Sequence, residues 1–73
     1  MQSASDILTT WIAEARRRNN TKLTLALWHA RDIVDGIAVL YDQSGIPEQI
    51  REAFDAMDQN NEDLKLVRKE VGV

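Results

Sequence analysis

The longest amphipathic pattern in this 73-residue chain is LTLALWHARDIVDGIAVL, residues 23–40. Its apolar residues recur at alternating spacings of three and four, which is the period of one face of an α-helix. The residues with this spacing are Leu23, Ala26, Ala30, Ile33, Ile37 and Leu40, and Leu27, Val34 and Tyr41 lie beside them. We therefore expect one long helix at residues 21–43, with the stripe packed against the core.

A second set of residues projects from the opposite side of the same predicted helix. At about 100° per residue, Trp28 and Val39 point away from the stripe, and Gly36 between them permits the close approach of another helix. A tryptophan outside the apolar face of a small protein indicates a surface that a partner covers. The predicted interface residues are Leu25, Trp28, Asp32, Asp35, Gly36 and Val39. The alternative is that the first helix of the same chain covers Trp28.

Two further helices are predicted on either side of this one. Ser3 or Ser5 can cap a first helix at residues 5–18, and Asn19 tolerates the left-handed backbone that ends many helices. Gly45 and Pro47 indicate a tight turn into a third helix at residues 47–70. The polar run at residues 58–63 leaves open a kink near 59–61, or a new helix that starts there.

The expected fold class is therefore all-α. We expect a short N-terminal helix and a long antiparallel helical hairpin, which together make a three-helix bundle that dimerises into a larger helical bundle.

Length and composition limit the class of protein. A chain of this size forms one domain, residues 1–73, and is marginally stable alone. It has no cysteine and one histidine, so neither disulfides nor a structural zinc site can staple it. Association of identical chains is then the remaining way to stabilise the fold, and we therefore predict a homodimer. The longest apolar runs are far shorter than the roughly 18 residues that span a bilayer, so we expect a cytoplasmic protein with no membrane partner.

Two charged segments are candidate contact sites. Guanidinium groups suit phosphates, so the candidate nucleic-acid contacts are Arg16, Arg17, Arg18 and Lys22. Acidic residues recur at helical spacing in the third predicted helix and would form a single ridge for a partner: Glu48, Glu52, Asp55, Asp58 and Glu62. The simpler interpretation is a basic helix end that complements the helix dipole and an ordinary solvated face.

The sequence contains no arrangement that indicates catalysis, a cofactor or a metal site. Its serines lie at predicted helix ends, where capping explains them, and it has no glycine-rich phosphate loop. We therefore predict a non-enzymatic protein–protein interaction module that acts as a regulator, adaptor or inhibitor of a larger complex. From its size and type, we expect its source to be a phage or plasmid accessory gene that disarms a host complex. The alternative is a nucleic-acid-associated protein that uses residues 16–22.

Overall fold

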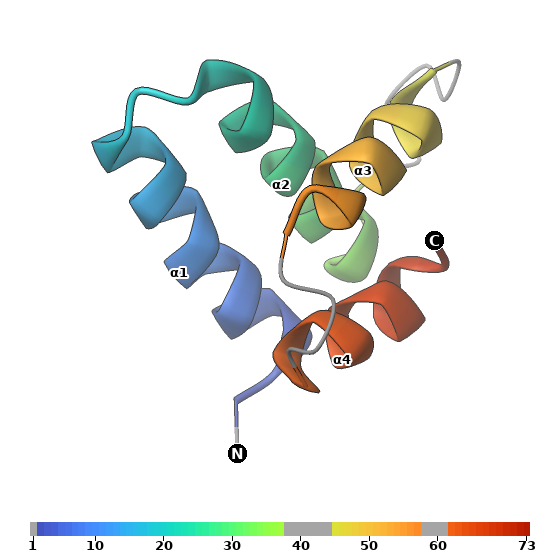
Figure 1. Ribbon diagram of the computed structural model, residues 1–73. Helices are drawn as coiled ribbons and strands as arrows, with labels where there is room; N and C mark the ends of the chain where they lie inside the picture. The colour runs from blue at the N-terminus through green and yellow to red at the C-terminus, as the bar shows by residue number, and fades with distance from the viewer. Residues whose placement is uncertain (1, 38–44, 58–61) are drawn as a thin grey trace.

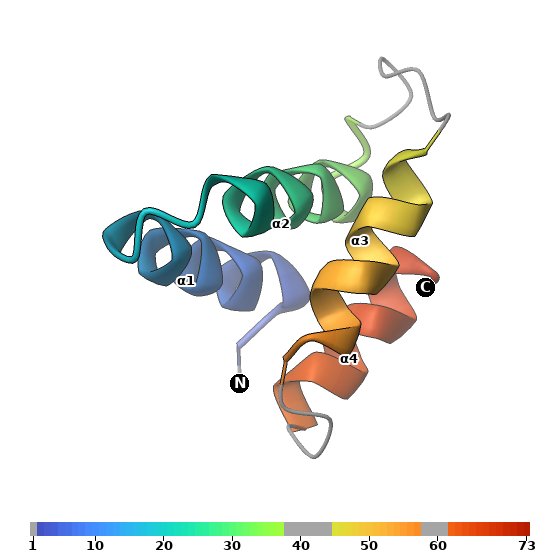
Figure 2. The same cartoon turned by 45° about the horizontal axis from the view of Figure 1, so that its top comes forward.

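The computed structural model describes residues 2–37, 45–57 and 62–73, and these residues form four α-helices. The helices are α1 (Ala4–Arg17), α2 (Thr21–Val34), α3 (Ile46–Asp55) and α4 (Glu62–Val71). α1 and α2 lie side by side as a helical hairpin, α3 packs against α2, and α4 contacts both helices of the hairpin (Figures 1 and 2). The described residues contain no strand, so the all-α prediction is confirmed for them.

Local capping residues set the ends of α1 as the sequence predicts. The side chain of Ser3 accepts a hydrogen bond from the Asp6 amide at 3.2 Å, which satisfies one free N–H of the first turn. Asn19 adopts a φ of +56°, and the amides of Asn19 and Asn20 donate to the carbonyls of Arg16 and Ala15. This pair of hydrogen bonds is a Schellman motif, which terminates the helix and turns the chain into α2.

The predicted second helix at residues 21–43 is too long. α2 ends at Val34, because Gly36 takes a φ of +79° and its amide donates to the carbonyl of Ile33. The amide of Ile37 then donates to the carbonyl of Asp32, which completes a second Schellman motif. The part of the prediction that covers residues 38–43 lies outside the described residues.

In place of the predicted single helix at residues 47–70, two helices occupy this part of the chain, which agrees with the alternative of a new helix starting in the polar run at residues 58–63. α3 begins at Ile46 after Gly45, which has the positive φ expected of it, and Pro47 lies in the first turn. α3 ends at Asp55, and α4 starts seven positions later at Glu62. The predicted kink at residues 59–61 lies outside the described residues, and in the described ranges four helices replace the predicted three.

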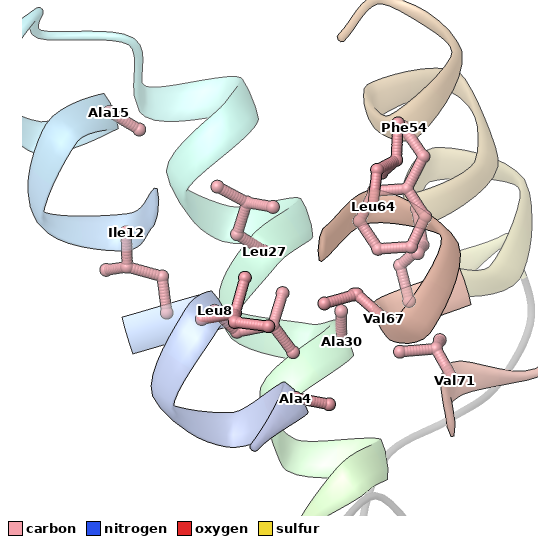
Figure 3. Packing of buried hydrophobic residues seen from close by; sticks show 12 residues of the cluster. Ala4, Leu8, Ile12, Ala15, Leu27, Ala30, Phe54, Leu64, Val67 and Val71 are labelled. Atoms are coloured by element: carbon pink, nitrogen blue, oxygen red, sulfur yellow. The ribbon is translucent and has the colours of Figure 1, made fainter. Parts of the chain in front are cut away.

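The core is formed by apolar side chains from all four helices (Figure 3). Its two largest contributors from α3, Ile50 and Phe54, are completely buried, and so is Leu27 on α2. The buried cluster consists of Ala4, Ile7, Leu8, Ile12, Ala15, Leu27, Ala30, Ile50, Phe54, Leu64, Val67 and Val71. Trp11 packs against this cluster while only half-buried.

One ion pair and one ring contact fasten α4 to α3. The Arg68 Nη2 atom donates to the Asp55 carboxylate at 2.6 Å, and the Arg68 guanidinium lies over the Phe54 ring.

In the described ranges, no helix has the length and apolar character that crossing a membrane requires.

Candidate protein-binding surfaces

The outer side of α2 carries two exposed apolar side chains. Leu25 is 50% exposed and Trp28 is 43% exposed, whereas Leu27 on the opposite side of the helix is completely buried. Leu25 and Trp28 are three residues apart, so they lie next to each other on the helix surface. Packing within the chain therefore leaves 43% of Trp28 exposed, so the covering by the first helix that the sequence left open is incomplete.

Arg31 borders Trp28. Its guanidinium carbon lies 5.9 Å from the centre of the Trp28 ring, and its Nη1 atom donates to the Thr9 hydroxyl of α1 at 3.4 Å. The contact between cation and ring restricts how Trp28 can move, so the indole is partly held in place before anything binds. We refer to Leu25, Trp28 and Arg31 as the Trp28 surface.

The other predicted interface residues are placed differently. Asp32 is buried, and its carbonyl accepts a hydrogen bond from the Ile37 amide at 2.8 Å. Asp35 and Gly36 are exposed at the end of α2. Within the described chain, no heavy atom lies within 4 Å of the site of a Cβ on Gly36, so its positive φ explains this glycine. Val39 lies outside the described residues.

The four predicted nucleic-acid contacts lie around the turn between α1 and α2, and acidic groups lie among them. Arg16, Arg17, Arg18 and Lys22 are all exposed. Arg17 pairs with Glu14 at 3.9 Å, and Lys22 pairs with Glu52 of α3 at 4.0 Å. The structure therefore does not present an uninterrupted basic face to a phosphate backbone.

The predicted acidic ridge is interrupted. Glu48, Glu52 and Asp55 are exposed on α3, Glu62 is at the start of α4, and Asp58 lies outside the described residues. The single ridge required one continuous helix, and α3 ends at Asp55. Each described member also has a cation within 4.0 Å, and the four pairs are Glu48–Arg51, Glu52–Lys22, Asp55–Arg68 and Glu62–Lys65.

A groove that the sequence did not indicate lies between three helices. It has a volume of about 680 Å³ and is lined by side chains from α1, α2 and α3 and from the turns beside them. Small side chains create much of the space, namely Ala15, Ala26, Ala53 and Ala56. In the sequence, these alanines are the feature that could have indicated a groove. They line one because α1 and α3 pack on α2.

The described residues contain no group of three or more His, Asp or Glu side chains arranged to hold a metal ion. Comparison with protein-family models, with curated proteins and with solved structures found no match to this chain.

Proposed function

We propose that this protein is a non-enzymatic helical interaction module that pairs with a second copy of itself through the Trp28 surface. In this proposal the pair acts in the cytoplasm as a regulator, adaptor or inhibitor of a larger macromolecular complex. The observation that supports it best is the exposure of Leu25 and Trp28 on the side of α2 that faces away from the core. Tryptophan and arginine, both present in this surface, are the residues most enriched at the energetic centres of protein interfaces.

A second copy is the simplest partner for this surface. Two α2 helices that cross about a twofold axis place Leu25 and Trp28 of each copy against the other, and such self-complementary contacts are the commonest in oligomers. The chain is short and has no cysteine, so additional burial between copies stabilises a fold that has no disulfide. A net charge of −3 opposes pairing only weakly.

The expected strength of pairing follows from the exposed area. A tryptophan buries roughly 150–250 Å², so covering the 43% of Trp28 that is exposed contributes on the order of 2 kcal/mol per copy. Leu25 contributes further buried apolar area. The polar side chains around both residues must supply the rest of an interface of about 1,000 Å². After the loss of translational and rotational freedom is set against these contributions, we expect a weak dimer with a dissociation constant in the range of roughly 1 to 100 μM.

Site-directed cross-linking tests this proposal directly, because the chain has no native cysteine. A Leu25→Cys variant places one thiol on the Trp28 surface, and an Ala13→Cys variant places one on an exposed part of α1. Treatment with a short bis-maleimide is expected to join two Leu25→Cys chains efficiently and two Ala13→Cys chains poorly. Equal yields from the two variants would contradict pairing through α2.

A further inference from the structure

One side chain of the Trp28 surface reaches a neighbouring helix. Arg31 of α2 is half-buried, and its Nη1 atom donates to the hydroxyl of Thr9 on α1 at 3.4 Å. Its guanidinium carbon lies 5.9 Å from the centre of the Trp28 ring. The same guanidinium therefore contacts the exposed indole and a hydroxyl of the helix that runs beside α2 (Figure 2).

The Thr9 hydroxyl is oriented to accept this hydrogen bond. It donates its own proton to the carbonyl of Ser5, one turn earlier in α1, at 2.9 Å. A hydroxyl has one proton and two lone pairs, so the bond to Ser5 leaves the lone pairs of Thr9 for an incoming N–H. A β-branched side chain has few χ1 rotamers in a helix, and this bond selects among them. Arg31 therefore meets a fixed acceptor, although Thr9 itself is exposed.

Arg31 also has a second acceptor within reach. Asp35 follows it by four residues and is exposed, and side chains at this spacing are neighbours on a helix surface. An ion pair between the two would draw the guanidinium off the Trp28 ring. Among the described residues, the ion pairs do not include one between Arg31 and Asp35. The bond to Thr9 holds the guanidinium over the ring instead.

We propose that Thr9 is a positioning residue of the Trp28 surface, which keeps the Arg31 guanidinium over the Trp28 ring and away from Asp35. The bond is long, so it affects the arrangement of these side chains and not the stability of the fold. The placement of Arg31 is a property of a single chain. Its effect on binding rests on the pairing proposed above, because a ring held in place loses less conformational entropy when two copies pair.

Three variants at two neighbouring positions isolate the hydroxyl. Thr9→Val removes it and keeps the shape of the side chain, whereas Thr9→Ser keeps it. Thr10→Val is the matched control, because the exposed Thr10 hydroxyl also donates to a carbonyl one turn earlier, that of Asp6 at 3.2 Å. Thr10 lies about 100° around α1 from Thr9, and among the described residues its hydroxyl makes no hydrogen bond to α2. Urea denaturation is expected to give the same midpoint for Thr9→Val and Thr10→Val.

Nuclear magnetic resonance measures the placement of Arg31 in the unaltered chain and in each variant. Protons held over an indole ring resonate upfield of their ordinary values, and a dilution series extrapolates this shift to the single chain. We expect the Arg31 side-chain protons to be shifted upfield in the wild type, in Thr9→Ser and in Thr10→Val. In Thr9→Val the shift is expected to fall towards the value of an unstructured chain. An equal shift in Thr9→Val and the wild type would overturn the proposal.

Removal of the competing carboxylate provides a second readout. In the double variant Thr9→Val, Asp35→Asn, the guanidinium has no ion pair to form at position 35, so Arg31 is expected to regain most of its upfield shift. Asp35→Asn alone is expected to leave the shift as it is in the wild type. A shift that stays lost in the double variant would overturn the competition between Thr9 and Asp35 for Arg31.

Sedimentation equilibrium separates this inference from the pairing itself. Thr9→Val is expected to raise the dissociation constant of the pair about two- to fivefold, whereas Thr9→Ser and Thr10→Val match the wild type. If the wild type does not pair, the proposed function fails, and the resonance shifts still decide the role of Thr9. If Thr9→Val loses the upfield shift and pairs as tightly as the wild type, the effect of Thr9 on pairing is contradicted.

Discussion

The guanidinium carbon of Arg31 lies 5.9 Å from the centre of the Trp28 ring, and the same side chain reaches the Thr9 hydroxyl of α1. Arg31 thus links the most exposed aromatic ring of α2 to the neighbouring helix. A large apolar side chain that is held in place loses less conformational entropy on binding than a free one. The Trp28 surface is therefore partly preorganised for a partner.

Removing Arg31 is expected to weaken pairing more than it weakens the fold. Arg31→Ala releases the Trp28 ring, which then loses more conformational entropy on pairing, so we expect a dissociation constant a few times higher. Arg31→Met retains most of the aliphatic length without the charge and separates packing from electrostatics. Sedimentation analysis measures the pairing, and urea denaturation measures the stability. An unchanged dissociation constant in Arg31→Ala would show that this residue takes no part.

The contacts of Arg68 predict a larger effect on stability. Its guanidinium carbon lies 5.6 Å from the centre of the Phe54 ring, it binds the Asp55 carboxylate at 2.6 Å, and its side chain is only 24% exposed. Arg68→Ala is expected to lower the free energy of unfolding by about 1–3 kcal/mol.

Arg51→Ala is the control for this prediction, because Arg51 forms an exposed pair with Glu48 on the same helix. That change is expected to cost less than about 0.5 kcal/mol. Equal losses of stability in the two variants, measured by urea denaturation, would contradict the assigned role of Arg68.

The end of α2 gives a prediction that depends only on backbone geometry. Gly36 has a φ of +79°, and a Cβ there meets no atom of the described chain within 4 Å. Gly36→Ala is therefore expected to destabilise the protein by about 1–2 kcal/mol through backbone strain alone. D-alanine at position 36, introduced by chemical synthesis, favours a positive φ and is expected to preserve or raise the stability. Destabilisation by both enantiomers would indicate a steric cause instead.

The mixed charges around the turn between α1 and α2 predict weak binding to nucleic acid. Glu14 and Glu52 pair with Arg17 and Lys22, so we expect only non-specific DNA binding with a dissociation constant of about 10⁻⁴ M or weaker at physiological salt. Fluorescence anisotropy with a labelled duplex measures this. Binding in the nanomolar range that falls steeply with salt, and that is lost when Arg16, Arg17 and Arg18 are changed to Glu, would support the nucleic-acid alternative.

The elements that the sequence predicted well are those with local causes. The start of α1, its end and the start of α2 depend on Ser3, Asn19 and Asn20, whose capping roles involve residues at most five positions away. The exposure of Leu25 and Trp28 likewise follows from helical periodicity once the buried side of α2 is known.

The errors arose where apolar periodicity continues across a helix end. Ile37 and Leu40 continue the apolar spacing of α2, so periodicity predicted a continuous helix. The Schellman turn at Gly36 ends the helix instead. Leu64 and Val67 likewise keep the spacing of Ile50 and Ala53, although α3 ends at Asp55. The groove depends on how α1 and α3 are placed on α2, and this placement is set by contacts between residues far apart in the chain.

Sedimentation equilibrium over roughly 1 to 100 μM tests the proposed pairing most directly. We predict that the average mass of the wild type rises with concentration from the 8.3 kDa of one chain towards twice that value. In the same range Trp28→Ala is expected to stay near the mass of one chain, and Trp28→Phe to lie between the two. A wild-type protein that remains at the mass of one chain throughout, or a Trp28→Ala variant that pairs as well as the wild type, would contradict the account.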